Sequence, residues 1–330
     1  MSRSCFYSAS PRFRFIPAAI VTLSAALISA PAFADDTGSN DSASARFTGP
    51  LVSSSPPLPK GAWNIEPYLI RSEVSGFWDR DGNRHSTDSS HTWRLAVPVM
   101  YGATDRISLG ASFNAYYGNG EGPAFGDTRL SLLYLLAQGG GEHTPKLTLA
   151  VRQNLHTGHH DLLEQRSTSF ATGSGAPTTT LGLYGQAYYL DRKLRGRVNL
   201  SWQLPYSGVD VEGRSGYGTQ DGFRGEVDLG AEFEGTLGLE YSLSPKWALA
   251  LDVVYENQRP SDLHGTLDDG SGEKLYRADG PSHSWRVSIA PAIEYHWNDQ
   301  VGVIFGAMKS LDGRNTSDVF SPQIAVNVGF

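Results

Sequence analysis

The sequence predicts an all-β protein: a transmembrane, antiparallel, up-and-down β-barrel of about twelve strands that follows a cleaved signal peptide. Three observations favour this fold. Apolar side chains recur at every second position in twelve segments, the connections between those segments alternate in length, and aromatic residues flank several apolar faces at both ends. A period of two is the pattern of a β-strand with one apolar face.

Residues 1–34 are predicted to be a secretory signal peptide. Three arginines precede an apolar run over residues 15–30, and Ala-Phe-Ala at 32–34 is a cleavage site of the A-x-A type. A membrane anchor is the alternative, but a spanning helix needs about 20 apolar residues. The only cysteine, Cys5, lies here, so the mature chain would have no disulfide and no cysteine-ligated metal.

Residues 35–60 form the next predicted segment, a flexible periplasmic lead-in. The segment is rich in Ser, Asp, Gly and Pro and has no periodicity. A plug inside the barrel is the alternative, although little apolar material is available to hold it. The barrel itself would occupy residues 61–330.

The charge of the mature chain disfavours nucleic acid as a partner. Without the leader, 24 Lys and Arg stand against 34 Asp and Glu, a net charge near −10. The 37 glycines and the 22 tyrosines and tryptophans suit strands joined by many turns.

Twelve alternating segments are expected to be the barrel strands. They centre near Ile65, Val97, Phe113, Leu132, Val151, Leu183, Leu200, Ala231, Leu251, Ile289, Ile304 and Val326. Five short connections alternate strictly with six long ones, as in barrels with tight periplasmic turns and longer outer loops. The long connections are expected around residues 72–91, 118–126, 157–177, 207–224, 257–283 and 310–318.

A soluble β-sandwich is the competing fold, because its strands also alternate. Two features argue against it. Aromatic pairs such as Trp93 with Tyr101 and Trp247 with Tyr255 flank the apolar faces, as membrane-interface girdles require. The opposite faces carry too much charge for a sandwich core.

Several short motifs resemble the outer-membrane family named for the meta-pathway of phenol degradation. They are "LPKGAWNIEPYL" at 58–69, "VPVMYGATDRISLGASF" at 97–113, "GDTRLSLLYLL" at 126–136 and "VNVGF" at 326–330. The resemblance covers residues 58–330. It implies a barrel that transports aromatic or other small molecules, and the family's name does not imply an enzymatic activity.

If the apolar faces meet lipid, the intervening charged residues line the lumen. The predicted pore-lining residues are Arg94, Arg129, Arg152, Arg197, Glu226, Asp228, Glu232, Glu234, Asp252 and Arg286. Glu226 to Glu234 would share one face of an eighth strand. These charges would either set up a transverse field that orients solutes, or pair with one another without selecting anything. A narrow barrel packed shut by its side chains is a third possibility.

A histidine-rich string, "NLHTGHHD", contains the weak metal candidates His156, His159, His160 and Asp161. Imidazole is a common metal ligand. No further ligand at a fixed spacing accompanies them, and loop histidines are usually solvated. We therefore predict no metal site and no cofactor.

An enzymatic barrel is the alternative to a channel. Ser288 and His296 share a strand face but lie eight positions apart, and His156 with Asp161 only loosely matches a surface-protease pair. The sequence contains no Gly-x-Ser-x-Gly, no His-Glu-x-x-His and no phosphate loop. We therefore predict no enzyme; a hydrolase or protease barrel and a closed structural or surface-binding barrel are the alternatives.

The functional prediction is a channel for passive uptake of small molecules, among them aromatic or other hydrophobic compounds, in the outer membrane of a Gram-negative bacterium. The last strand would close against the first, around "WNIEPYLI". The expected partners are outer-membrane lipids, a small-molecule solute and, through the terminal Phe330, the barrel insertion machinery, a role that rests on resemblance to outer-membrane barrels.

Overall fold

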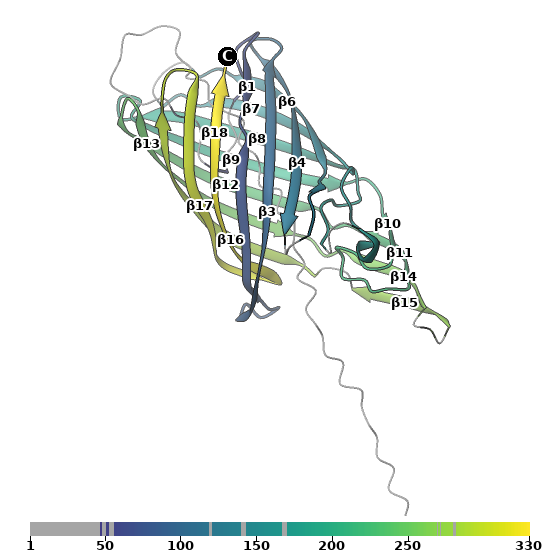
Figure 1. The fold of residues 1–330 in the computed structure, drawn as a ribbon. Helices are drawn as coiled ribbons and strands as arrows, with labels where there is room; N and C mark the ends of the chain where they lie inside the picture. The colour runs from purple at the N-terminus through teal and green to yellow at the C-terminus, as the bar shows by residue number, and fades with distance from the viewer. Residues whose placement is uncertain are drawn as a thin grey trace, which may run out of the picture.

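Two β-sheets make up the fold (Figure 1). The computed structural model describes residues 47, 51–52, 56–118, 121–139, 143–166, 170–268, 270, 272–279 and 282–330. The expected signal peptide, 1–34, lies outside these residues. Over the described ranges, no helix is long and apolar enough to cross a membrane.

The larger sheet is a closed barrel of twelve antiparallel strands, as predicted. Its ring order follows the chain, and β2 pairs with both β3 and β18. The strands are β2 (Tyr68–Trp78), β3 (Arg84–Gly102), β4 (Ile107–Gly118), β6 (Thr128–Ala137), β7 (Lys146–Leu155), β8 (Thr178–Tyr189), β9 (Leu194–Pro205), β12 (Glu232–Ser244), β13 (Trp247–Gln258), β16 (Ser284–His296), β17 (Val301–Arg314) and β18 (Thr316–Gly329).

The barrel closes at the expected seam between the first and last strands. The short strand β1 (Trp63–Ile65) lies between β3 and β18, and β2 continues the same wall after Glu66 and Pro67. Trp63 and Phe330 exchange backbone hydrogen bonds of 2.7 and 3.1 Å. The last strand therefore has no free edge. A further short strand, β5 (Ala124–Phe125), extends the pairing of β4.

Side chains alternate between an apolar outer face and a largely polar interior. Along β13, exposed and buried residues alternate from Trp247 to Tyr255. The outward Phe113 and Leu237 are 52% and 57% exposed, whereas the inward Asp252 is fully buried. An apolar belt on the outside of a closed polar barrel is the arrangement that a lipid bilayer requires.

Aromatic rings gather at the barrel end that holds the chain terminus. The Trp63 and Tyr101 ring centroids lie 4.7 Å apart, and those of Trp247 and Tyr295 lie 4.6 Å apart. At the opposite end of their strands, Trp202 packs on Phe233 at 5.1 Å. Such pairs suit the two interfaces of a membrane.

Two of the predicted long loops are instead extended hairpins. β2 runs to Trp78 and β3 begins at Arg84, while only Asn315, with φ at 48°, separates β17 from β18. The expectation of loops at 72–91 and 310–318 was therefore wrong. These strands pass beyond the apolar belt, where neither face needs apolar residues, so backbone pairing continues after the alternation stops.

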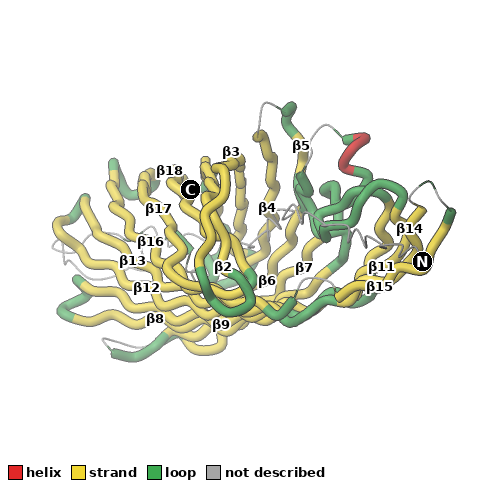
Figure 2. The backbone as a smooth tube through the Cα atoms, turned by 90° about the horizontal axis from the view of Figure 1, so that it is seen from below, coloured by secondary structure: helices red, strands yellow, loops and turns green. Residues whose placement is uncertain are grey.

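The smaller sheet lies to one side of the barrel opening, at the end away from the C-terminus (Figures 1 and 2). Its order is β10 (Val209–Glu212), β11 (Phe223–Asp228), β14 (Asp262–Asp268) and β15 (Glu273–Asp279). It is built from the β9–β12 and β13–β16 connections. Its core contains Val209, Val211, Phe223, Val227 and Leu263. A turn of 3₁₀-helix, η1 (Leu163–Gln165), lies in the β7–β8 connection.

This second sheet corrects the predicted eighth strand. Residues 226–241 are not one strand, because β11 ends at Asp228 and β12 begins at Glu232. Between them the backbone of Gly230 passes the Arg259 carbonyl oxygen so closely that a Cβ would lie 2.1 Å from it. Glu226 and Asp228 therefore lie in the second sheet and not on the barrel wall.

Candidate functional site

The lumen carries opposite charges on opposite sides. Arg94, Arg129 and Arg152 occupy inward positions of β3, β6 and β7, and carboxylates occupy inward positions of β12 and β13. Glu234 lies directly opposite Glu256 in the β12–β13 register.

The arginines of β6 and β7 interact electrostatically with the carboxylates of β12. Arg129 is within electrostatic range of Glu232, and Arg152 is within range of Glu234. Five of the ten predicted pore-lining residues thus form two facing groups: Arg94, Arg129 and Arg152 on one side, and Glu232 and Glu234 on the other.

Arg286 is neutralised locally. Its Nε and Nη2 donate to the two carboxylate oxygens of Glu256 at 2.7 and 2.9 Å, across the β13–β16 register. Arg286 is 4% exposed. A bidentate pair of this kind is a strong, directional interaction, so it removes Arg286 from the freely available charges of the lumen.

A second buried pair lies nearer the end that holds the C-terminus. Arg195 Nε and Nη2 donate to Glu240 at 2.6 Å each, and Arg197 Nε lies 3.5 Å from the same carboxylate. Arg195 and Glu240 were not among the predicted pore-lining residues. Arg195 could have been predicted from the sequence, because it lies two positions from Arg197 and therefore on the same inward face of the strand.

Four apolar residues of the segment before the barrel are buried against the inner face of the barrel. Phe47, Leu51, Val52 and Leu58 are each at most 5% exposed. Leu51 and Val52 pack against small and apolar inward side chains of the barrel. These partners are Tyr68, Ile70, Ala96, Ala250, Val254, Ala290, Ala292, Ile304 and Ala325.

Polar contacts fix the same segment. The Val52 amide donates to Asp252 Oδ2 at 2.8 Å, and the Leu58 amide donates to Ser108 Oγ at 2.7 Å. Phe47 lies beneath the Arg195 guanidinium, 4.8 Å from its ring centroid. These contacts hold the described residues Phe47, Val52 and Leu58 against the inner face of the barrel, and Asp252 accepts one of the hydrogen bonds.

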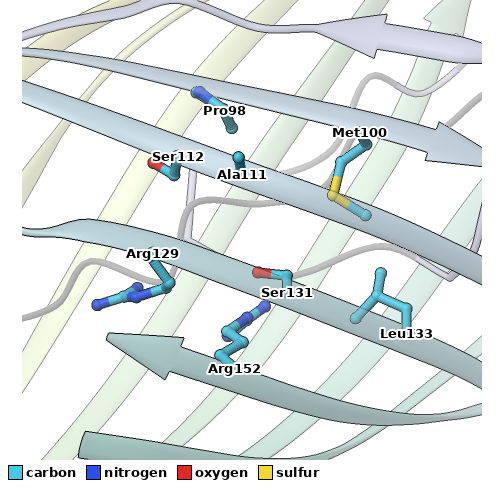
Figure 3. Close-up of a pocket in the computed structure, with 8 residues that line it drawn as sticks. All are labelled: Pro98, Met100, Ala111, Ser112, Arg129, Ser131, Leu133 and Arg152. Atoms are coloured by element: carbon cyan, nitrogen blue, oxygen red, sulfur yellow. The ribbon is translucent and has the colours of Figure 1, made fainter. Parts of the chain in front are cut away.

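Leu58 packs with two residues, Met100 and Leu133, that line a small cavity in the barrel wall. It clusters with Met100, Leu133, Ala150 and Tyr184. The cavity has a volume of about 30 Å³ and is shown in Figure 3. Its lining residues are Pro98, Met100, Ala111, Ser112, Arg129, Ser131, Leu133 and Arg152.

The histidine-rich string has a structural role in the outer connections. His160 Nε2 lies 2.9 Å from the Asp210 carbonyl oxygen, and Asp161 Oδ2 accepts the Glu212 amide at 3.1 Å, both on β10. His156 and His159 complete the string. Within the part of the chain that the structure describes, no three His, Cys, Asp or Glu side chains gather in a metal-binding group.

The pair weighed for hydrolysis is too far apart. Ser288 and His296 both face inward from β16, eight residues apart, which is about 26 Å along an extended strand. No proton can pass directly between them.

Comparisons with known proteins support the fold. No known family profile matches the chain, and no curated protein sequence matches it. The COG4313 outer membrane channel from Pseudomonas putida F1 has a similar structure, with a TM-score of 0.59 and 17% identity over 89% of this chain and 100% of that one. At this identity the likeness establishes the barrel fold alone.

Two further solved barrels are more distant. The KdgM porin aligns with a TM-score of 0.39 and 9% identity, over 78% of this chain and 97% of that one. The TodX monoaromatic hydrocarbon channel, as a deletion mutant, aligns with a TM-score of 0.39 and 12% identity, over 92% of this chain and 98% of that one. Scores this low carry no argument about solutes.

Proposed function

We propose that the protein is an outer-membrane channel for passive uptake of small molecules. The observation that carries the proposal is the closed barrel whose outer face is apolar and whose interior holds opposed charged walls. An interior lined by charge suits a water-filled path for polar or charged solutes. The shared fold of the Pseudomonas putida channel agrees with this assignment.

The proposed location is the outer membrane of a Gram-negative bacterium, reached with the signal peptide at 1–34. Lipid would contact the exposed apolar belt. Phe330, 59% exposed at the barrel end, would be the residue that the insertion machinery recognises. The short turns, the start of the first barrel strand and the end of the last would face the periplasm, and the second sheet would lie on the cell surface.

The solutes that the proposal names are small molecules, among them aromatic compounds. The family resemblance over residues 58–330 favours this class. Within the lumen, Arg129 and Arg152 opposite Glu232 and Glu234 would orient a dipolar or charged solute during passage.

Transport would require the segment before the barrel to move. Leu51 and Val52 fill part of the lumen and are held through Asp252. Their displacement would open the path along the alanine-lined wall. The resting channel would therefore conduct less than a barrel of twelve strands allows.

Planar-bilayer recording and liposome uptake test the proposal. The mature chain is compared with a variant in which Leu51 and Val52 are both changed to Ser. We expect single-channel steps in both, with a higher open fraction in the variant because two apolar anchors are lost. Absence of single-channel current and of solute uptake in both proteins would favour the closed structural barrel. Hydrolysis of an ester or peptide panel, lost on changing His156 or Asp161 to Ala, would favour an enzyme.

A further inference from the structure

We propose that the cavity at Arg129 and Arg152 binds the carboxylate group of a small organic acid with an apolar body. This inference rests on the proposed channel function and names a solute class for it. The cavity is formed by residues of β3, β4, β6 and β7 (Figure 3).

Two arginines at or near this site, Arg129 in the lining and Arg94 close to it, have no direct ion-pair partner among the described residues. Arg94 and Arg152 each lie within electrostatic range of Arg129. Among the residues that the structure describes, no carboxylate lies within 4.0 Å of the guanidinium of Arg94 or Arg129. This contrasts with Arg286 and Arg195, which each have a bidentate carboxylate partner. Clustered like charges shielded from water favour an anion that sits among them.

A buried hydroxyl provides a second, independent indication. Ser112 lines the cavity, is 6% exposed, and its Oγ has no hydrogen-bond partner among the described residues. Ser112 also lies directly opposite Arg129 in the β4–β6 register. A buried hydroxyl without a partner is costly, and an anionic oxygen placed beside Arg129 would accept its hydrogen bond.

The rest of the lining determines what kind of acid fits. Pro98, Met100 and Leu133 form an apolar side, and Leu58 of the segment before the barrel packs against Met100 and Leu133. The polar side of the cavity, at Ser112, Arg129 and Ser131, would hold the carboxylate group of the acid. The body of the acid would lie along the apolar side in the place of Leu58. Binding would thus favour displacement of that segment.

The planar guanidinium specifies the head group. Its fork of N–H donors matches the two oxygens of a carboxylate, whereas an ammonium group acts as a point charge. An alcohol or a hydrocarbon of the same size would bring no negative charge to the Arg129 guanidinium. The site should therefore discriminate by charge and geometry more than by shape.

Calorimetric titration of the full mature chain in detergent tests the proposal, with benzoate as the probe and benzyl alcohol as its neutral match. We expect saturable benzoate binding that is about tenfold or more tighter than benzyl alcohol binding. Arg129→Gln and Arg152→Gln should each weaken benzoate binding by about tenfold or more. Ser112→Ala should weaken it by about threefold to tenfold, and Arg129→Lys should fall between wild type and Arg129→Gln. Arg224→Gln, in the second sheet, is the matched control and should bind as wild type.

The outcomes separate the site from the channel. Absence of benzoate binding to the wild type, equal binding of benzyl alcohol, or wild-type affinity in Arg129→Gln would overturn the carboxylate site, whether or not the protein conducts. Benzoate binding lost in Arg129→Gln but retained in Arg224→Gln would support the site even if no current is recorded. Folding of each variant is checked by its heat-dependent shift in gel mobility. If Arg129→Gln fails to fold, Arg129→Lys and Ser112→Ala decide the question.

Discussion

The backbone amide of Val52 donates a 2.8 Å hydrogen bond to Oδ2 of Asp252, which lies 200 positions further along the chain on the inner face of β13. A segment that precedes the barrel is thereby attached to the middle of its wall. Leu51, next to it, packs against alanines of β13, β16 and β18. In the proposed channel, this part of the chain would compete with solute for the lumen.

Changing Asp252 to Ala should release this segment. A hydrogen bond to a charged group contributes about 1.5–3 kcal/mol, so its loss shifts the displaced population by about tenfold or more. Leu51→Cys reports the shift, because Cys5 lies in the expected leader and the rest of the sequence has no cysteine. We expect about tenfold faster labelling by a water-soluble maleimide. Asp228→Ala, in the second sheet, is the control, and equal labelling rates in the two variants would contradict a holding role for Asp252.

The Arg195–Glu240 pair should be asymmetric in its effect on stability. Glu240→Leu leaves Arg195 and Arg197 without this carboxylate, while Arg195→Met leaves Glu240 beside Arg197. Removing one partner of a buried pair costs about 3–5 kcal/mol. We expect Glu240→Leu to lower the free energy of unfolding most, Arg195→Met less, and the double variant less than Glu240→Leu. Urea unfolding in lipid vesicles measures all three, and additive losses would contradict the proposed coupling.

Most of the barrel could be predicted because each strand is exposed to two environments. Along β13, lipid-facing Trp247 to Tyr255 alternate with inward residues, so the period of two is visible without an alignment. The seam between "WNIEPYLI" and the last strand could also be predicted, because the first and last strands of an antiparallel barrel with an even number of strands pair with each other. Both the alternation and the closure follow from the physical requirements of a membrane barrel, so no specific motif was needed to predict them.

Other features depend on distant contacts that alternation does not encode. Glu226, Asp228 and Glu232 keep the same parity across Gly230, so the sequence hides the break between two sheets. Leu51 and Val52 are two apolar residues in a Ser- and Pro-rich stretch without a period. Their burial depends on the alanine-lined wall opposite them. The pairing of Arg195 with Glu240 likewise depends on the register between β9 and β12.

The carboxylates of β12 should set the ion preference of the channel. Changing Glu232 and Glu234 together to Gln removes two inward charges while preserving side-chain shape. Because a unit charge at 4 Å is worth about 1 kcal/mol in water, the cation-to-anion permeability ratio should fall by about twofold to fivefold. Reversal potentials in a KCl gradient measure the ratio.

The second sheet provides the matched control for this change. Glu226→Gln with Asp228→Asn also removes two carboxylates from β11, outside the barrel wall. Its reversal potential should equal that of the wild type. Equal shifts in both double variants would mean that the effect reflects overall charge, and no shift in either would mean that the lumen carboxylates do not select ions.

The tip of the β2–β3 hairpin should respond to acid through Asp79. Its Oδ2 lies 2.7 Å from His85 Nε2, and Oδ1 accepts the amides of Asp81 and Asn83. The hydrogen bond with His85, followed by that with the Asn83 amide, lowers the pKa of Asp79 well below its ordinary value of 3.8. Since the folded-state pKa is depressed, the stabilisation is complete above about pH 4 and is lost as the pH falls through the lower folded-state pKa.

Carboxyl titration by NMR checks this dependence. In the wild type the Asp79 signal should titrate below the range of an exposed aspartate. His85→Gln should raise the Asp79 pKa toward 3.8, because the largest cause of the depression is removed. An unchanged Asp79 pKa in His85→Gln would show that the backbone amides alone hold the carboxylate.

Asp127 should control the order of the connection between β7 and β8. Its carboxylate accepts hydrogen bonds of 2.9 Å from Asn154 Nδ2 and the Gly158 amide, and of 2.9 and 3.0 Å from the Ser174 amide and hydroxyl. Asp127→Ala leaves these donors without their acceptor, at about 1–3 kcal/mol for each that stays buried. We expect about tenfold faster proteolysis between β7 and β8, with the barrel's heat-dependent gel mobility unchanged. Asp127→Asn keeps one acceptor oxygen, so its rate of proteolysis should lie between those of the wild type and Asp127→Ala. The control variant Asp81→Ala should be cleaved at the wild-type rate. If Asp127→Ala instead unfolds the barrel, the carboxylate supports β6 and β7 as well as the connection, because a loop contact alone would leave the strand pairing intact.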